Sequence, residues 1–367
     1  MLAPLTTPSR VALAHDWLNQ YGGAERVLEV LKALFPDAPV FTAMYWPDAL
    51  PAGYRAWDIR TSFLDGWPMV KQHHQPFLPF YPAAFASLDL TGYDLILSNK
   101  SAFCHGVRKP PGARHVCYCL TPTRFVWDFD SYVAHEGRGR LARTLVPPLL
   151  SPLQAWDFDA AQRVDHFIGI SSAVRDRIRR IYRRDAAVLY PPVDLSQFAP
   201  SATRDDYYLV VSRLIPYKRV DIAIEAFNRL RRRLVIIGDG RDRARLESLA
   251  GPTIEFCGRL SDRETRAAMA QAKAFIFPGL EDFGLTPVEA QASGRPVIAY
   301  AAGGALDTVI PGLTGAWFYP QTADALAHAV EATNVDALDP AACRANAARF
   351  DVSVFRQRLA DFINALE

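Results

Sequence analysis

Short apolar segments of strand length alternate with segments of helical periodicity along this chain, and the alternation restricts the fold more than any other feature of the sequence. In the first half, the strand candidates are RVALAH (10–15), DLILSN (94–99), HVCYCL (115–120), HFIGIS (166–171) and AAVLYPPVD (186–194). The segment 23–35 follows the first of them with apolar residues at helical spacing. Strands that alternate with helices in this way form a parallel sheet that is covered by helices on both faces.

The same alternation starts again after residue 206. Its strand candidates are YYLVVSRL (207–214), RLVIIGDG (233–240), TIEFCGRL (253–260), AFIFPG (274–279) and PVIAY (296–300). Between the two series lies YPPVDLSQFAPSATRDD (190–206), whose prolines and polar residues are typical of a linker. We therefore predict an α/β chain with two Rossmann-like, doubly wound lobes that face a cleft, with ligands at the carboxyl ends of the strands.

The expected domain boundaries follow from this division. The N-terminal domain covers 1–192, the linker 193–206 and the C-terminal domain 207–348. Residues 349–367 contain an amphipathic helix, which can cross back to the N-terminal lobe. Its apolar face consists of Phe355, Leu359, Phe362 and Ile363.

Composition excludes several classes of protein. At 367 residues the chain is long enough for two domains, and its formal net charge of +2 gives no general argument for binding nucleic acid. The five cysteines are scattered and form no C-x-x-C pair, which favours a reducing compartment over a disulfide framework or a zinc site. The N-terminus lacks the pattern of a secretory signal, and no apolar run approaches the roughly 20 residues of a membrane span. We expect a cytoplasmic protein.

The segment FPGLEDFGLTPVEAQASGRPVIAYAAGG (277–304) contains two glutamates, Glu281 and Glu289, on either side of a predicted helix start. We place Thr286 as the N-cap, Pro287 as the first helical residue and Glu289 three residues after the cap. A helix start at the carboxyl ends of strands presents N–H groups and partial positive charge, which favour a phosphate. Glu289 is therefore either part of a capping box or an acceptor for a ribose diol, and Glu281 is either a solvated loop acid or a ligand group.

Together with motifs elsewhere, these residues resemble the retaining family 4 glycosyltransferases, which have the two-Rossmann GT-B fold. Glu281 and Glu289, with seven residues between them, are similar to the E-x7-E signature of that family. Further similar motifs are VVSRLIPYKRVD (210–221), IIGDG (236–240), FCGRLSD (256–262) and HDWLNQYGGAERVLEVLKALFPDAPVFTAMY (15–45). The segments CYCLTPTRFVWD (117–128), RVDHFIGISSAV (163–174) and VLYPPVDLSQF (188–198) look like a bacterial subset that builds O-antigen and exopolysaccharide, mostly mannosyltransferases that use GDP-mannose. The resemblance covers nearly the whole chain.

The resemblance implies a retaining, metal-independent hexosyltransferase that transfers mannose from GDP-mannose. It implies that Arg213 and Lys218 bind the diphosphate, that Glu281 touches the transferred sugar, and that these three residues are catalytic. Fixed positive charge is also what the chemistry needs, because negative charge develops on the departing phosphate. Glu289 is expected to bind the ribose hydroxyls. The other donor-binding residues that the resemblance implies are Gly22, Gly23, Gly258, Arg259, Leu260, Asp282, Phe283, Gly284, Leu285 and Thr286.

The expected acceptor site lies in the N-terminal lobe. His15 and Asp16 end the first predicted strand, and Thr121 and Arg124 lie in YCLTPTR after a later one. By resemblance these four residues contact the acceptor, although a lone histidine such as His15 is equally open to a structural role. Some relatives carry a histidine where this chain has Leu120, so the resemblance assigns no general base.

Neither a metal ion nor a cofactor is expected. Two Asp-Phe-Asp triplets, at 128–130 and 157–159, resemble the divalent-cation motif of the other common transferase fold. Both lie in the first half, away from the donor motifs, and the second has a helical pattern. The segment GDGRDR (238–243) has Arg243 where a dinucleotide-binding fingerprint needs glycine.

Two N-terminal stretches combine basic and apolar residues, as peripheral membrane-binding surfaces do. They are MVKQHHQPFLPFYPAAF (69–85) and RGRLARTLVPPLLSPL (138–153). Ordinary packing with a solvated edge explains either stretch equally well. The expected partners are a nucleotide sugar and a lipid-linked or oligosaccharide acceptor, with the cytoplasmic face of the inner membrane as a further candidate and no nucleic acid.

Three other functions stay open. A family 4 transferase can use a UDP-sugar such as UDP-glucose, and a sugar-nucleotide epimerase can share the same fold. A non-catalytic sugar-binding module is the third alternative, but such a module has no need for Arg213 and Lys218 as cations that neutralise a leaving group.

Overall fold

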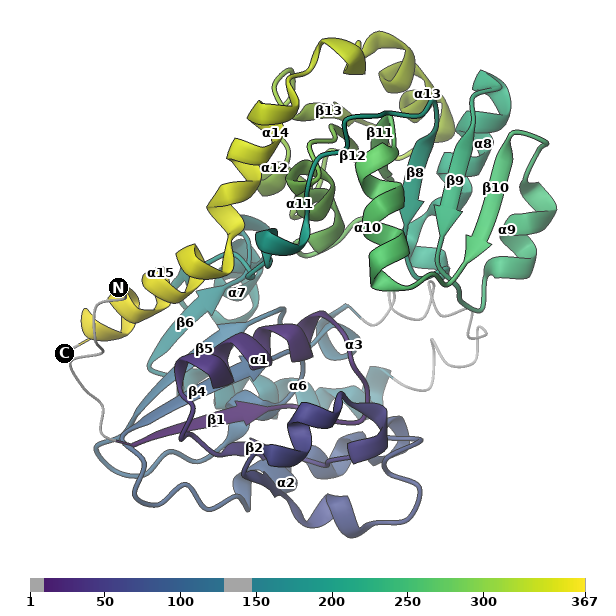
Figure 1. The fold of residues 1–367 in the computed structure, drawn as a ribbon. Coiled ribbons are helices and arrows are strands. Elements are labelled where there is room, and N and C mark those ends of the chain that lie inside the picture. Colours follow the sequence, from purple (N-terminus) through teal and green to yellow (C-terminus); the bar gives the residue numbers. More distant parts are fainter. Residues whose placement is uncertain (1–9, 129–146, 367) are drawn as a thin grey trace. The chain divides into compact units, whose positions relative to one another are not determined.

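The computed structural model describes residues 10–128 and 147–366 (Figure 1). It divides the chain into two compact units: a first unit of Met1–Tyr190 with Phe355–Glu367, and a second unit of Pro191–Val354. Each unit contains one parallel β-sheet. The prediction of two Rossmann-like, doubly wound sheets is confirmed.

The sheet of the first unit has seven parallel strands in the order β3-β2-β1-β4-β5-β6-β7. They are β1 Val11–His15, β2 Val40–Thr42, β3 Ile59–Thr61, β4 Leu95–Lys100, β5 Arg114–Cys119, β6 His166–Gly169 and β7 Ala186–Val188. The chain proceeds from β1 outward to β3 and then returns to place β4 on the other side of β1. The strand order therefore reverses between β1 and β4, which is where ligands bind in open sheets of this kind.

The helices of the first unit are amphipathic elements that cover this sheet. They are α1 Gly23–Leu34, α2 Tyr81–Ala86, α3 Arg124–Trp127, α6 Pro147–Gln162 and α7 Ser172–Tyr182. Helix α1 packs on β1 and β4 (Figure 1), and its buried positions recur at helical spacing. Helix α7 begins at Ser171, whose hydroxyl accepts a hydrogen bond from the N–H of Val174 at 3.1 Å.

The C-terminal helix α15 (Val352–Asn364) belongs to the first unit from Phe355 onward. Phe355 is buried against the ring of Tyr118 on β5, with ring centroids 5.6 Å apart. Phe362 lies edge-on to His166 at the start of β6, with ring centroids 6.3 Å apart. The amphipathic face of this helix thus packs on side chains of the first sheet.

The sheet of the second unit has six parallel strands in the order β10-β9-β8-β11-β12-β13. They are β8 Tyr208–Val211, β9 Leu234–Ile237, β10 Ile254–Gly258, β11 Ala274–Phe277, β12 Val297–Tyr300 and β13 Gly315–Phe318. The helices are α8 Val220–Leu230, α9 Arg243–Leu249, α10 Asp262–Gln271, α11 Leu285–Ala292, α12 Ala305–Thr308, α13 Ala323–Ala332 and α14 Pro340–Ala347. Here the strand order reverses between β8 and β11.

Both faces of the second sheet are buried, as the nearly continuous apolar runs predict. Successive residues of a strand point to opposite faces, and the strands β8 and β11 show this clearly. Val210 and Ile276 lie in the core that α8 and α13 cover, whereas Leu209 and Phe275 lie in the core on the other face. Because the side chains within these strands are used for packing, the polar groups of the unit collect at the strand ends and in the loops.

Candidate active site

The reversal between β8 and β11 brings two predicted site residues into contact. Lys218 ends the short 3-10 helix Pro216–Lys218 after β8, and Glu281 lies in the loop after β11. Their side chains form an ion pair and are 13% and 22% exposed, respectively. Together with Ser212 and Gly279 they line a small recess at the carboxyl ends of the two strands. The structure therefore places a cation and a carboxylate in contact at this edge.

Arg213, the second predicted cation, is exposed at the end of β8. Its Nη2 atom lies 3.4 Å from the hydroxyl oxygen of Tyr217, and the ring of Tyr217 lies 5.2 Å from Nζ of Lys218. Tyr217 therefore contacts both cations, through its hydroxyl and through its ring face. No carboxylate in the described ranges pairs with Arg213. The sequence reasoning missed Tyr217, and the only available signal was its place immediately before Lys218.

The loop that carries Glu281 is fixed by a second loop that packs against it. The N–H of Gly304 donates to the carbonyl oxygen of Glu281 at 2.9 Å. A Cβ atom on Gly303 would lie 2.2 Å from that same oxygen, and one on Gly304 would lie 2.2 Å from Cα of Phe283. Only glycine fits at these two positions, so the close approach of the loops holds the backbone of Glu281 in place.

The predicted start of helix α11 was wrong by two residues. The helix begins at Leu285 with Gly284 as its N-cap, and no side chain caps this end. Gly284 has φ +84°, and a Cβ atom there would lie 2.6 Å from the ring of Phe277. This close packing forces a left-handed glycine at the helix entrance and overrides the Thr286 cap pattern. Glu289 consequently lies in the second turn, so the capping-box interpretation of Glu289 is also wrong.

Most of the remaining predicted donor residues lie in loops at the same edge of the second sheet. Asp282, Phe283, Gly284, Leu285 and Thr286 form the connection from β11 into α11. Gly258 ends the edge strand β10 with φ +68°, followed by the exposed Arg259 and the half-buried Leu260. The N–H of Gly238 donates to the carbonyl oxygen of Gly258 at 2.8 Å, which connects the ends of β9 and β10. Gly22 and Gly23, by contrast, belong to the first unit, where Gly22 is the N-cap of α1.

In the first unit, His15 and Asp16 lie at the equivalent reversal between β1 and β4, and both are buried. Asp16 accepts five hydrogen bonds of 2.6–2.9 Å: from the N–H groups of Ser101, Ala102, Phe103 and Cys104 and from the hydroxyl of Ser101. These bonds occupy both carboxylate oxygens and hold the loop after β4.

His15 is equally enclosed by side chains of the first unit. Its Nε2 atom lies 3.3 Å from Glu25 Oε1, and its Nδ1 atom lies 3.3 Å from Nδ2 of Asn99. Glu25 comes from α1 and Asn99 from β4, so the imidazole joins two elements next to the β1/β4 reversal. In this position His15 has a packing role that its sequence context also allowed.

Thr121 and Arg124 follow β5 in a segment that is held by a buried polar network. The hydroxyl of Thr121 accepts a hydrogen bond from Nη1 of Arg177 at 2.7 Å, and its carbonyl oxygen lies 3.3 Å from Nζ of Lys100. Lys100 is fully buried; burial lowers its pKa, but the charges of Asp157 and of other nearby groups together outweigh this, and the net pKa of Lys100 is raised. Arg124 begins helix α3 and is half-buried.

The second Asp-Phe-Asp triplet lies on helix α6, as its pattern indicated. Asp157 accepts hydrogen bonds from Thr123, Trp127 and Tyr182 at 2.6–2.8 Å and is fully buried. In the first triplet, residues 129 and 130 lie outside the described residues. Residues 10–128 and 147–366 contain no group of three or more His, Cys, Asp and Glu side chains that is arranged to hold a metal ion.

The first proposed membrane stretch is partly core and partly exposed. Tyr81 and Phe85 are fully buried, so the expectation that they form part of an exposed surface was wrong. The ring of His74 lies 4.8 Å from that of Trp17, and burial lowers the pKa of His74. Met69 and Phe80 remain exposed.

The second stretch falls mostly on residues 138–146, which lie outside the described residues, while Leu150 and Leu153 within it are buried. No helix in the described part of the chain is long and apolar enough to cross a membrane.

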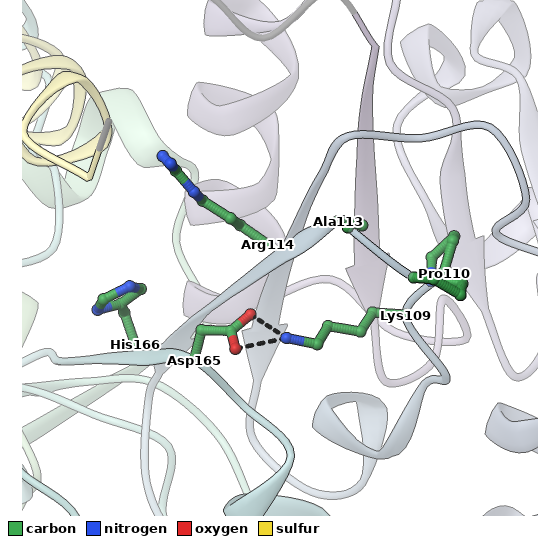
Figure 2. Close-up of a pocket in the computed structure, with 8 residues that line it drawn as sticks. Lys109, Pro110, Ala113, Arg114, Asp165 and His166 are labelled. Atoms are coloured by element: carbon green, nitrogen blue, oxygen red, sulfur yellow. Dashed lines mark hydrogen bonds and ion pairs between the residues drawn. The ribbon is translucent and has the colours of Figure 1, made fainter.

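A surface hollow occurs in the first unit at the opposite edge of its sheet (Figure 2). It is lined by Lys109, Arg114, Asp165 and His166, with the loop 110–113 between them. Figure 2 shows the ammonium group of Lys109 directed at the carboxylate of Asp165. Burial raises the pKa of Asp165, but hydrogen bonds from Lys109 and from the N–H of His115 outweigh it and lower the pKa. Because β5 and β6 begin here, the hollow lies away from the carboxyl ends where ligands bind.

Comparison with known proteins shows which family the second unit resembles. The family model for Glycosyl transferases group 1 matches residues 194–350, the part of the chain that carries Arg213, Lys218 and Glu281. The site at the β8/β11 reversal therefore lies within the part of the chain that is similar to this family.

The chain is also similar to two mycobacterial proteins. The chain is 36% identical over 179 residues to a GDP-mannose-dependent alpha-mannosyltransferase of Mycolicibacterium smegmatis. The aligned residues cover 44% of this chain and 46% of that protein. It is 41% identical over 155 residues to a GDP-mannose-dependent alpha-mannosyltransferase of Mycobacterium tuberculosis, which covers 38% of this chain and 41% of that protein. The chain thus spans less than half the length of these two relatives.

The similarity in fold covers both units. Anabaena HepE in complex with UDP has a TM-score of 0.71 to this chain at 20% identity, over 97% of this chain and 100% of that one. At this identity the likeness concerns the fold alone: HepE has a fold similar to that of this chain.

Proposed function

We propose that this protein is a retaining mannosyltransferase that moves mannose from GDP-mannose to a lipid-linked or oligosaccharide acceptor in cell-surface polysaccharide synthesis. The observation that carries the proposal is the Lys218–Glu281 pair, with Arg213 beside it, at the strand reversal in the part of the chain that is similar to the Glycosyl transferases group 1 family. The names of the two mycobacterial relatives support GDP-mannose as the donor.

In the proposed reaction, the bond between the anomeric carbon and the β-phosphate oxygen breaks, and an acceptor hydroxyl oxygen bonds to that carbon. Negative charge develops on the departing diphosphate, and Arg213 and Lys218 neutralise it. Arginine binds phosphate as a planar fork and lysine as a movable point charge, so the two cations serve different oxygens. The N–H groups at the start of α11, behind Gly284, add partial positive charge.

Glu281 contacts hydroxyl groups of the transferred sugar in this proposal, and Glu289 binds the ribose diol. We assign no covalent role to Glu281: the acceptor attacks from the face that the diphosphate leaves, and the departing phosphate takes the acceptor proton. Trapping of a glycosyl adduct on Glu281, detected by mass spectrometry, would overturn this assignment. The backbone around Gly258, Arg259 and Leu260 is proposed to contact the base, and Thr121 and Arg124 to contact the acceptor. His15 and Asp16, which are buried, are proposed to hold the loops beside the acceptor rather than to touch it.

A thermal-shift panel of GDP-, UDP- and ADP-sugars tests the donor. A ligand at about 100 times its dissociation constant stabilises the fold by roughly 2.7 kcal/mol, so the correct donor raises the melting temperature. We expect a shift with GDP-mannose and GDP. A shift with UDP-sugars and none with GDP compounds would replace the mannose assignment with the UDP-sugar alternative, which the UDP-bound HepE structure makes the first one to test.

The epimerase alternative is tested in the same sample. Incubation of GDP-mannose with the protein and no acceptor is expected to leave the sugar configuration unchanged, as chromatography of the nucleotide sugars will show. An epimerised product would replace the transferase proposal.

Peripheral membrane contact is a separate part of the proposal. The exposed side chains of Phe63 and Phe80 lie beside the ring of Trp67. The exposed Met69 follows two residues later, close in sequence to Lys71 and His73. Such a surface suits the headgroup region of an anionic bilayer, where a lipid-linked acceptor is found. Flotation with anionic liposomes is expected to recover the protein at low salt and to lose it at high salt. Failure to float at low salt removes this part of the proposal.

A further inference from the structure

The ion pair between Lys218 and Glu281 occupies the cation that the proposed reaction needs for the diphosphate. Lys218 has three N–H donors, and in this structure its ammonium group contacts the Glu281 carboxylate and lies over the ring of Tyr217. Both charged side chains are more than three-quarters shielded from solvent. A phosphate that approaches Lys218 therefore meets a carboxylate already in contact with the same ammonium group.

The two partners of this pair differ in their freedom to move. The backbone of Glu281 is held by Gly304 and by the close contacts at Gly303, whereas Lys218 has a flexible four-carbon stem. Binding of a diphosphate must therefore divide the Lys218 donors between phosphate and carboxylate, or draw Lys218 away from Glu281. Either change leaves Glu281 close to further negative charge, and like charges repel more strongly where solvent is limited.

A bound sugar changes this balance. A sugar hydroxyl can donate a hydrogen bond to the Glu281 carboxylate and so replace part of the contact with Lys218. A nucleoside diphosphate without its sugar brings the negative charge but no such donor. The carboxylate is thus favourable next to the substrate and unfavourable next to the product.

We infer that Glu281 competes with the diphosphate for Lys218 and thereby weakens the binding of the nucleoside diphosphate product relative to the nucleotide sugar. This inference rests on the proposed function, because it concerns the diphosphate site of that function. It gives Glu281 a role in product release in addition to its contact with the sugar. The inference predicts that removing the negative charge of Glu281 improves binding of the nucleoside diphosphate. An ion pair alone, or a sugar contact alone, makes no such prediction.

The test is calorimetric titration of GDP and GDP-mannose into the full chain and into Glu281→Gln. Glutamine keeps the size and a hydrogen-bonding oxygen but lacks the negative charge. We expect Glu281→Gln to bind GDP about tenfold more tightly than the wild type, which corresponds to about 1.4 kcal/mol, with a smaller change for GDP-mannose. The gain is expected to shrink at high salt, because part of it is electrostatic.

A second ion pair between the same two strands provides the matched control. Asp206 and Lys273 form a pair of 2.7 Å just before β8 and β11 begin, at the opposite edge of the sheet. Asp206→Asn removes the same charge from the same unit, away from the recess, and is expected to change the dissociation constant for GDP less than twofold. In a Lys218→Met background, Glu281→Gln is expected to lose the part of its effect that comes from releasing the ammonium group, so that the remaining gain measures direct repulsion between carboxylate and phosphate.

Each outcome has a distinct meaning. The inference is overturned, and the proposed function stays intact, if the wild type binds GDP and both Glu281→Gln and Glu281→Ala bind it equally or more weakly. Wild type that binds neither GDP nor UDP overturns the proposed function and the inference with it. If both Glu281 variants fail to fold, the carboxylate is primarily structural and the inference is also overturned.

Discussion

The two sheets reverse their strand order in the same way, but the carboxylates next to the two reversals have opposite environments. Asp16, next to the β1/β4 reversal, is 1% exposed and accepts five hydrogen bonds from residues 101–104. Glu281, next to the β8/β11 reversal, is 22% exposed and pairs with the flexible Lys218. Topology therefore identifies where a site can form, and the hydrogen-bond partners determine whether the carboxylate there is structural or available to a ligand.

This difference has an energetic consequence. A buried acceptor that is removed leaves its donors without partners, which costs far more than the loss of a partly exposed ion pair. The first unit is thus expected to depend on its strand-end acid for stability, and the second unit to use its strand-end acid for binding. Each of the following experiments can break or sharpen this contrast, and they are ordered by the size of the expected effect.

The largest effect is expected for Asp16→Ala. Four backbone N–H groups lose a buried acceptor, at about 1–3 kcal/mol each, so the free energy of unfolding should fall by at least about 4 kcal/mol. Urea unfolding followed by tryptophan fluorescence measures this change, and six of the seven tryptophans lie in the first unit. Glu281→Ala is the matched variant and is expected to lose less than about 1 kcal/mol. Equal losses in the two variants would remove the contrast.

The next effect concerns turnover. Lys218→Met is expected to lower kcat by about 10²–10³-fold, because the charge on the leaving diphosphate is no longer neutralised, while the melting temperature changes little. Lys273→Met, at the other edge of the same two strands, is the control and should keep wild-type kcat. Measurement of mannosyl transfer under saturating donor separates the two. Full activity of Lys218→Met would show that the second reversal is not the catalytic site.

A smaller effect is expected from acid. Burial lowers the pKa of His115 to about 3, so this imidazole is neutral in the folded chain at pH 5–6. The unfolded chain, with a histidine pKa of about 6.5, takes up the proton as the pH falls, and the free energy of unfolding drops by roughly 1 kcal/mol between pH 6 and pH 5. This stability is present above about pH 6.5 and is lost toward pH 3. His115→Gln should flatten the slope, whereas the exposed His328→Gln should not.

The same reasoning predicts that the first unit unfolds before the second as the pH falls. In the described part of the chain, His105 and His115 are buried histidines with a lowered pKa, and both belong to the first unit. Burial also lowers the pKa of His105 well below its usual value. Loss of the second unit before the first on acidification would contradict this expectation.

The smallest effect is expected at Tyr217. Tyr217→Leu removes the ring next to Lys218 and should weaken GDP binding by about 0.5–1 kcal/mol, or two- to fivefold. Tyr217→Phe keeps the ring and removes the hydroxyl, which lies 3.4 Å from Arg213, and should change binding less than twofold. Calorimetry on the two variants separates ring from hydroxyl. A larger loss of GDP affinity in Tyr217→Phe than in Tyr217→Leu would show that the hydroxyl contributes more to binding than the ring does, which contradicts the prediction.

Much of the fold could be predicted from the sequence, because buried parallel strands are continuous apolar runs. The strands β8, β9, β11 and β12 are four-residue runs of buried or nearly buried side chains, and all were predicted. The strands that the analysis missed are β2, β3 and β13. The first two have only three residues, too few to show a period, and β13 begins with a glycine at φ +156°.

The site was only partly predictable, since its decisive contacts are non-local. The acceptors and donors around Asp16 are separated by more than 80 residues, so a carboxylate at a strand end looks the same whether it is saturated or open. The entrance to α11 is set by the packing of Gly284 on Phe277, which the local Thr286-Pro287 pattern does not contain. The family resemblance implied separate roles for Lys218 and Glu281, and the strand reversal explains why the two side chains form an ion pair.

A crystal structure of the protein soaked with GDP-mannose or GDP tests the central claim most directly, namely that the second unit binds the leaving diphosphate through fixed cations. The account predicts β-phosphate oxygens within about 3 Å of Nζ of Lys218 and next to the Arg213 guanidinium, with Lys218 drawn from Glu281. A diphosphate bound elsewhere, with the Lys218–Glu281 pair unchanged, would contradict it.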